Sequence, residues 1–150
     1  AELNREYARC TRTGHDSVVA MLDLDHFKRV NDSYGHGTGD MVIKALSNLL
    51  RHRLRNTDII GRYGGEEFVI VLPECSLEKA VEVLEALSRD FARLVFNGGN
   101  EEFSVTFSAG VAVLTAYGSG DQAIDAADRA LYRRKRAGRN GVTVASGDQP

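Results

Sequence analysis

The chain has 150 residues, of which 43% are hydrophobic and 27% are charged, and its formal net charge is −2. These values describe one ordinary globular domain with a core of its own. A net charge this close to zero argues against broad binding of a nucleic-acid polymer, although a local cluster of cations can still hold a small phosphorylated ligand. Cys10 and Cys75 have no metal-binding spacing, which favours free thiols in a reducing, cytoplasmic compartment. No apolar run approaches the roughly 20 residues of a membrane span, so no direct membrane contact is expected.

The first half of the chain predicts helices around one apolar strand with an acidic end. Residues 1–13 are charged and helix-compatible, and Gly14 is expected to end this helix. Residues 18–22 form a β-prone run suited to a central strand, which leads into Asp23 and Asp25. Because side chains alternate along a strand, these two carboxylates share one face. We expect a helical turn over 26–30, a glycine-rich loop over 31–40 and an amphipathic helix over 39–52.

The second half predicts a hairpin, two helices and further strands. Gly64 and Gly65 lie between the apolar runs 59–60 and 68–72, which is typical of a hairpin with a primed two-residue turn. The remaining expected elements are a helix from an N-cap at Ser76 to about Leu94, a turn over 97–100, an alternating strand over 103–113, a helix from Asp121 to Ala137 ended by a left-handed Gly138, and a strand over 142–144. This order predicts an α+β sheet with helices packed on it.

Two adjacent carboxylates, Glu66 and Glu67, follow the glycine pair of the predicted hairpin. Negative charges beside a buried strand raise the free energy of the fold unless a positive group meets them. A metal ion that carries a phosphate would serve, and the alternative is a solvated hairpin tip whose charges deter edge pairing. Asp23 and Glu66 lie at the ends of strands that could be neighbours, and Mg²⁺ typically takes one or two protein carboxylates.

Other polar residues near these carboxylates allow both a functional and an ordinary interpretation. Asp25 either belongs to the site or caps the helical turn that starts at His26. Lys28, Lys135 and Arg139 either bind phosphate or are solvated charges, the last two at the end of a helix. The backbone amides at the start of the His26 turn offer a further anion site.

Asn31 and Asp40 could read a purine base. A carboxylate accepts from the N1–H and exocyclic amine of guanine, and an asparagine can both donate and accept. Read alone, they are a loop asparagine and an aspartate in the first turn of a helix.

Several separated segments agree in order and spacing with one known family. They are Asp23-Leu24-Asp25-His26-Phe27-Lys28, Asn31-Asp32, Gly35-His36, Gly39-Asp40, Arg62-Tyr63-Gly64-Gly65-Glu66-Glu67-Phe68, Ser108-Ala109-Gly110-Val111, and Ala127-Asp128 through Leu131-Tyr132 to Lys135 and Gly138-Arg139-Asn140. From about residue 17 to 144 the chain thus resembles the GGDEF domain, the diguanylate cyclase family.

The resemblance implies a palm-like fold of the nucleotidyl-cyclase type with a ferredoxin-like core and a central, mainly antiparallel sheet. It implies Mg²⁺-dependent condensation of two GTP molecules into cyclic di-GMP and two pyrophosphates in an antiparallel homodimer, with Mn²⁺ as an alternative ion. By position it assigns the metal to Asp23, the Leu24 carbonyl and Glu66, the catalytic base to Glu66 or Glu67, guanine to Asn31 and Asp40, and phosphates to Lys28, Lys135, Arg139 and the His26 and Phe27 amides.

The same resemblance assigns an inhibitory product site to Arg55 and Asp58, in an Arg-x-x-Asp at the family's usual distance before Gly64. The second arginine of such a site is not evident, since Ala86 is near its position and Arg89 follows one turn later.

The stretch that usually opens the family's domain is missing. We therefore expect residues 1–150 to be a single GGDEF domain from a longer signalling protein, which could be membrane-anchored with this domain in the cytoplasm. The alternative function is a non-catalytic sensor that binds cyclic di-GMP, which the intact Gly64–Phe68 motif disfavours.

Overall fold

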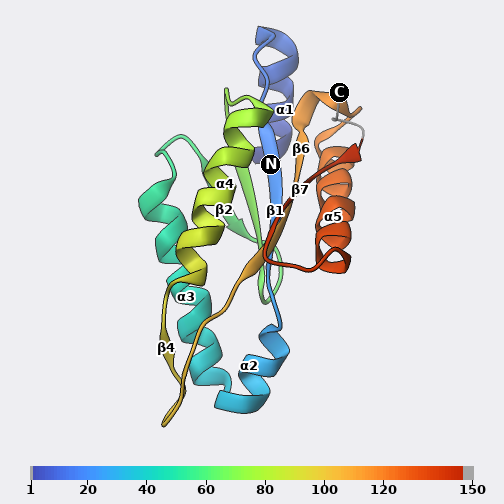
Figure 1. Cartoon of the computed structure of the whole chain (residues 1–150). Helices are drawn as coiled ribbons and strands as arrows, with labels where there is room; N and C mark the ends of the chain where they lie inside the picture. Colours follow the sequence, from blue (N-terminus) through green and yellow to red (C-terminus); the bar gives the residue numbers. More distant parts are fainter. Residues whose placement is uncertain (1, 147–150) are drawn as a thin grey trace.

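The computed structural model describes residues 2–146 and has a five-stranded sheet between two layers of helices (Figure 1). The elements in chain order are α1 (Glu2–Thr13), β1 (Val18–Leu24), α2 (Phe27–Tyr34), α3 (His36–Arg53), β2 (Ile59–Arg62), β3 (Glu67–Leu72), α4 (Leu77–Ala92), β4 (Phe96–Asn97), β5 (Glu102–Phe103), β6 (Phe107–Val113), the 3₁₀ helix η1 (Leu114–Ala116), α5 (Gly120–Arg136) and β7 (Gly141–Val144).

The strands of the sheet lie in the order β2-β3-β1-β6-β7. β1 is antiparallel to both β3 and β6, β2 is antiparallel to β3, and only the β6–β7 pair is parallel. The predicted fold class, α+β with a mainly antiparallel sheet flanked by helices, is confirmed. Among the described residues, no helix has the length and apolar character that a membrane crossing requires.

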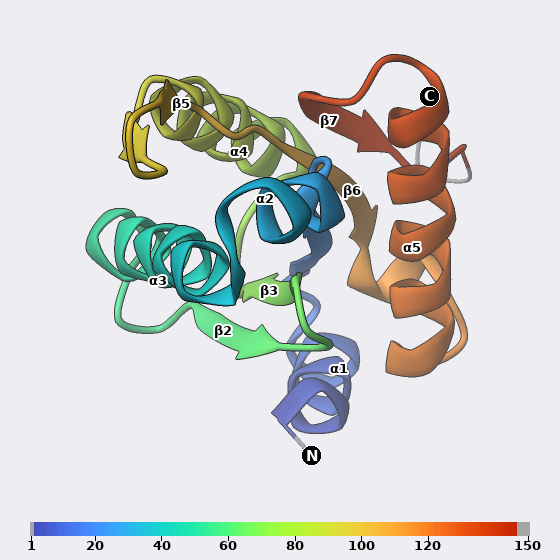
Figure 2. The same ribbon diagram turned by 90° about the horizontal axis from the view of Figure 1, so that it is seen from below.

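Helices cover both faces of the sheet, with α2, α3 and α4 on one face and α1 and α5 on the other (Figure 2). β1 contributes to both layers, because Ala20 and Leu22 pack with the first group and Val19 and Met21 with the second. A strand buried on both faces is apolar at successive positions, which explains the unbroken run at 18–22.

α5 lies unusually close to β6, and Gly110 permits this approach. A Cβ atom at Gly110 would lie 2.1 Å from the backbone oxygen of Ala127 and 2.3 Å from the backbone nitrogen of Leu131. The small side chains of Ala123 and Ala130 are buried on the same helix. This close packing fixes where the C-terminal end of α5 meets the sheet.

The predicted loop over 31–40 was wrong, because most of this segment is helical. α2 continues to Tyr34 and α3 begins at His36, so Gly35 alone joins them, with a φ of 91°. Such a conformation favours glycine, and it lets one residue turn the chain. The remaining glycines lie in the first turns of α3, where propensity alone argued against a helix.

The predicted single strand over 103–113 was also wrong. β5 ends at Phe103 and pairs with β4 in a separate small hairpin, whereas β6 begins at Phe107. The alternation of apolar residues continues through both strands, so the sequence pattern does not reveal the break. The predicted turn over 97–100 is confirmed as the connection of this small hairpin, with Gly99 at a φ of 85°.

The predicted hairpin between β2 and β3 is confirmed, but its turn differs from the prediction. Residues 63–66 form a four-residue connection, and neither Gly64 nor Gly65 is among the residues with positive φ. The Tyr63 N–H donates to the Glu67 carbonyl at 2.8 Å and closes the loop. The glycines therefore serve a purpose other than a primed turn.

Three predicted helix boundaries are confirmed. Gly14 follows α1 with a φ of 79°, and Gly138 follows α5 with a φ of 126°. The Ser76 hydroxyl accepts a hydrogen bond from the Lys79 N–H at 3.1 Å and caps α4.

Candidate active site

The acidic residues of the sequence meet at one end of the β1–β3 pair. Asp23 is the cross-strand partner of Glu67, and the Leu24 N–H donates to the Glu66 carbonyl at 3.4 Å. The predicted proximity of these strand ends is therefore present, because β1 and β3 are neighbours in the sheet.

Asp23 is 7% exposed, and its two carboxylate oxygens have different environments. Oδ2 forms an ion pair with the Lys135 ammonium, which extends from α5 and donates a hydrogen bond to it. Oδ1 is buried and has no hydrogen-bond partner among the described residues. A buried carboxylate oxygen without a partner raises the free energy of the fold, and a bound cation would satisfy it.

The two glutamates of the hairpin have raised pKa values. Burial raises the pKa of Glu66, and the neighbouring negative charge of Asp23 adds to the effect. Burial also raises the pKa of Glu67, together with the charges of Asp23 and Asp128. Glu67 lies against the hairpin loop, since a Cβ at Gly64 would approach its Oε1 to 3.1 Å. Among the described residues, the Lys135 cation thus meets Asp23, Glu66 and Glu67, and Asp128 adds a fourth negative charge near Glu67.

This arrangement fits a divalent ion of the Mg²⁺ class. No group of three or more His, Cys, Asp or Glu side chains in residues 2–146 could hold a metal ion by itself. Mg²⁺ does not require one, because it binds through one or two carboxylates and takes its other oxygens from phosphates and water. Asp23 and Glu66, with the Leu24 carbonyl, would provide such a partial set.

Asp25 has a structural role that neither sequence interpretation anticipated. Its carboxylate accepts hydrogen bonds from the Thr106 hydroxyl at 2.6 Å, the Ser108 hydroxyl at 2.7 Å and the Asn140 N–H at 3.0 Å. Its three hydrogen-bond donors in the described residues lie at positions 106, 108 and 140 and none is an amide of α2, so the Asp25 carboxylate does not cap this helix. The carboxylate instead joins the end of β1 to β6 and to the loop after α5.

The two candidate base-reading residues lie on neighbouring helices. Asn31 is in α2, and its Oδ1 is buried without a hydrogen-bond partner in the described part of the chain. Asp40 is exposed near the start of α3, immediately after Gly39, whose backbone lies against the Asn31 amide. The two residues therefore lie near each other across the α2–α3 contact.

The candidate phosphate-binding residues are not equally close to the acidic end. Lys135 contacts Asp23 directly. Lys28 is exposed and pairs with Asp32 at 3.3 Å along α2. Arg139 is exposed with a φ of 64° in the loop after α5. His26, with a φ of 56°, leads into Phe27 at the first residue of α2.

Arg55 and Asp58 form a second polar site, away from the acidic end. The Arg55 guanidinium donates to the Asp58 carboxylate at 2.7 Å and to the Pro73 carbonyl at 2.7 Å. The Asp58 side chain is 2% exposed, whereas the Arg55 side chain is 53% exposed. Both line a pocket of about 410 Å³ that also includes Cys75 and Lys79.

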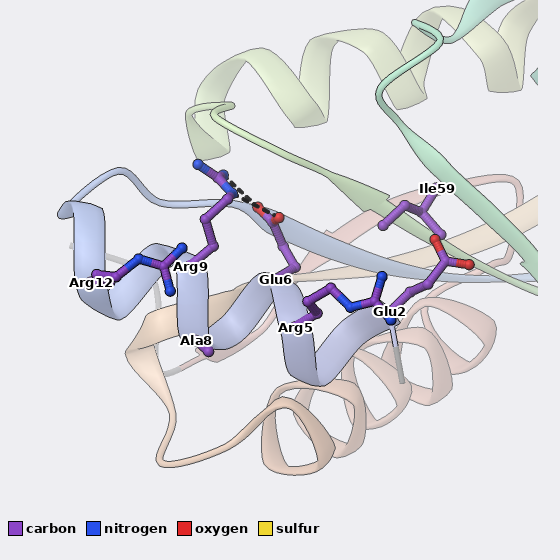
Figure 3. Close-up of a pocket in the computed structure, with 7 residues that line it drawn as sticks. All are labelled: Glu2, Arg5, Glu6, Ala8, Arg9, Arg12 and Ile59. Carbon is purple, nitrogen blue, oxygen red and sulfur yellow. Dashed lines mark hydrogen bonds and ion pairs between the residues drawn. The ribbon is translucent and has the colours of Figure 1, made fainter.

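A further pocket, of about 350 Å³, lies between α1 and β2 and has no residue in common with the acidic site (Figure 3). Its most buried charge is Glu6, which accepts two hydrogen bonds from Arg9 and one from Ser17. These contacts, above all those from Arg9, lower the pKa of Glu6. The carboxylate is satisfied within the protein, so we assign it to the attachment of α1.

The sheet order, the helix layers and the acidic hairpin define a palm-like α+β domain of the nucleotidyl-cyclase class. The profile of the family described as "Diguanylate cyclase, GGDEF domain" matches residues 1–141. The chain belongs to this GGDEF family.

Individual relatives agree with this assignment. The chain is 47% identical over 143 residues to diguanylate cyclase DgcP of Pseudomonas aeruginosa and 36% identical over 141 residues to diguanylate cyclase DosC of Escherichia coli. These matches cover 95% and 93% of this chain but only 21% and 31% of those proteins. The chain thus spans about a fifth to a third of the length of these two relatives.

Two solved structures are similar to nearly the whole chain. The GGDEF domain of DgcB from Caulobacter crescentus, in complex with c-di-GMP, has a TM-score of 0.91 at 35% identity, with 96% of this chain and 86% of that chain covered. The active GGEEF domain of a diguanylate cyclase from Vibrio cholerae has a TM-score of 0.89 at 32% identity, with 96% and 92% covered.

Proposed function

We propose that this domain is a diguanylate cyclase that condenses two GTP molecules into cyclic di-GMP and releases two pyrophosphates. The observation that carries the proposal is the acidic end of β1 and β3. There a buried, unpartnered oxygen of Asp23 lies beside two glutamates with raised pKa values and one lysine. Family membership and relatives named as diguanylate cyclases support the same reaction.

Asp23, the Leu24 carbonyl and Glu66 would hold a divalent cation, Mg²⁺ or Mn²⁺. When bound, this cation neutralises phosphate charge and stabilises the charge that develops during phosphoryl transfer. The negative charges of Asp23 and Glu66 repel each other when both carboxylates are ionised, and a bound cation would offset this repulsion. Lys135 already reaches Asp23, and it would turn to a phosphate oxygen once that carboxylate has another positive partner.

The remaining residues would bind and orient the nucleotide. The Asp40 carboxylate would accept hydrogen bonds from the guanine edge, and the Asn31 amide could both donate to it and accept from it. Lys28, Arg139 and the His26 and Phe27 amides would contact phosphates.

A carboxylate with a raised pKa is suited to take up a proton, because its basicity is closer to neutral pH. Glu66 or Glu67 would accept the proton of the 3′-hydroxyl. That oxygen then bonds to the α-phosphorus of the second GTP, and the bond to pyrophosphate breaks.

Closing the ring requires this step twice, and each domain would hold one GTP. We therefore propose that catalysis takes place in an antiparallel homodimer. Arg55 and Asp58 would bind cyclic di-GMP as an inhibitory product site, supported by their place in a pocket beside β3 and α4.

The test is turnover of GTP with Mg²⁺ at rising protein concentration, with the products identified by mass spectrometry. We expect cyclic di-GMP as the product, and we expect its rate of formation per domain to increase with protein concentration. Glu66→Gln should lower the rate by about 100-fold or more, whereas Glu85→Gln, an exposed position on α4, should leave it unchanged. A Glu66→Gln variant with the wild-type rate would contradict the proposed site. Binding of cyclic di-GMP without any turnover would favour a sensor instead.

A further inference from the structure

A polar pocket of about 320 Å³ lies between α3 and the end of β2. Its charged lining residues are Lys44, Arg51 and Asp40 from α3 and Arg62 from β2. Three cations and one carboxylate give this lining a formal charge of +2, in a chain whose net charge is −2. The pocket is therefore positive against the charge of the whole domain.

The three cations of this pocket have no carboxylate partner among residues 2–146. Elsewhere in the domain exposed cations do form ion pairs, as Arg53 does with Asp90 across the α3–α4 contact. Asp40 lies one helical turn before Lys44, yet no ion pair joins them. A single exposed cation is ordinary, but three that line one hollow repel one another, and a multivalent anion would offset this repulsion.

The Arg62 guanidinium is held in place before any ligand binds. It donates a hydrogen bond to the Gly65 carbonyl, and it lies 5.7 Å from the centroid of the Phe68 ring. That hydrogen bond uses one of the five N–H donors of a guanidinium. A guanidinium that is already oriented loses little conformational freedom when it binds an anion.

The spacing of the donors favours an anion with two phosphorus centres. Lys44 and Arg51 are seven residues apart on α3, which is a rise of about 10.5 Å. Ser47 and Asn48 lie between them in the same pocket, and they add a hydroxyl and an amide donor. A diphosphate group has oxygens at both ends, so it suits donors spread over two helical turns better than a single carboxylate does. Arginine and lysine both bind phosphate oxygens through charge-assisted hydrogen bonds.

We propose that this pocket is a second phosphate site, which binds a diphosphate group through Lys44, Arg51 and Arg62. It is separate from the acidic end of β1 and β3, because neither Asp23 nor Lys135 lines it. Binding there needs neither a metal ion nor the cyclase reaction, so the site stands or falls independently of the proposed function. Since Arg62 also contacts the Gly65 carbonyl, a bound diphosphate would connect α3 to the loop that carries Glu66.

The experiment measures binding of inorganic pyrophosphate to the whole chain by isothermal titration calorimetry, with EDTA and at low ionic strength. Lys44→Gln and Arg51→Gln should each weaken binding about fivefold or more, because each removes a charged donor. Arg129→Gln is the matched control. Arg129 is an exposed cation on α5 that does not line the pocket, so its removal makes the same change in net charge and should alter affinity by less than about twofold.

Asp40→Asn should have the opposite effect. It removes the carboxylate of the pocket, so pyrophosphate should bind about fivefold more tightly. Asp125→Asn, at an exposed position on α5, is its control and should change affinity by less than about twofold. A loss of folded protein cannot produce a gain in affinity, so this variant separates an electrostatic effect from misfolding.

Two further measurements give the place of binding and the source of the diphosphate. In nuclear magnetic resonance spectra, pyrophosphate should shift the amide signals of Ser47 and Asn48. ADP is the second probe: tighter binding of pyrophosphate identifies the free anion as the ligand, and tighter binding of ADP identifies a nucleotide, provided that binding depends on Lys44 and Arg51. No binding, or binding that survives Lys44→Gln and Arg51→Gln and is lost in Lys135→Gln, would overturn the proposal.

Discussion

Asp25 offers the sharpest test of how the end of β1 is built. Replacing it with alanine removes the acceptor of three hydrogen bonds, of 2.6, 2.7 and 3.0 Å, from a residue that is 4% exposed. Hydrogen bonds to a buried charge contribute roughly 1.5–3 kcal/mol each, but the Thr106 and Ser108 hydroxyls can rotate to other partners. The Asn140 N–H cannot. We therefore expect Asp25→Ala to lower the free energy of unfolding by about 3–5 kcal/mol.

Asp25→Asn should be milder. The asparagine oxygen can still accept from the Asn140 N–H, and its amide nitrogen can donate to the Ser108 hydroxyl, which accepts as well as donates. We expect a loss of about 1–2 kcal/mol. Urea denaturation followed by circular dichroism gives both values, with Asp32→Ala as the control. Within residues 2–146 the Asp32 carboxylate makes an exposed pair with Lys28, so its truncation should change stability by less than about 1 kcal/mol. A loss below about 1 kcal/mol in Asp25→Ala would refute this structural role.

Three further predictions concern charge, packing and the product site. Glu66→Gln should raise the free energy of unfolding at neutral pH. The pKa of Glu66 is raised in the folded state, so its protonated form is the stabilising one and this stability is lost as the pH rises through the folded pKa. The difference between the variant and the wild type should therefore vanish in acid below the ordinary range of glutamate, and a constant difference from pH 3 to 8 would contradict it. Gly110→Ala should lower the free energy of unfolding by more than about 3 kcal/mol, because the added carbon meets the backbone of α5. A melting curve identical to that of the wild type would refute this packing. Arg55→Ala should raise the product concentration that halves the initial rate about 10-fold, and an unchanged value would remove Arg55 from the inhibitory site.

The acidic end of the sheet could be predicted from the sequence, because the strand before Asp23 and the hairpin before Glu66 each have a local sequence pattern. The apolar run before Asp23 indicates a buried strand, and the glycine pair before Glu66 indicates a hairpin. Adjacency of β1 and β3 then brings the carboxylates together. The resemblance to a known family added the roles, which spacing alone left open.

The helical segment around Asn31 could not be predicted, because its glycines argue against a helix. Gly39 is needed for contact with another helix, which propensity does not describe.

The hydrogen-bond partners of Asp25 could not be predicted from the sequence for a different reason. Its partners Thr106 and Asn140 lie 81 and 115 residues away in the sequence. A local pattern contains no information about partners at that separation.

The most direct measurement is a crystal structure of the chain with Mg²⁺ and 3′-deoxy-GTP. We predict a cation within about 2.1 Å of oxygens from Asp23, Glu66 and the Leu24 carbonyl, with Lys135 turned from Asp23 to a phosphate oxygen. A nucleotide bound elsewhere, with the Lys135–Asp23 ion pair intact and no cation beside it, would contradict a metal site at Asp23 and Glu66.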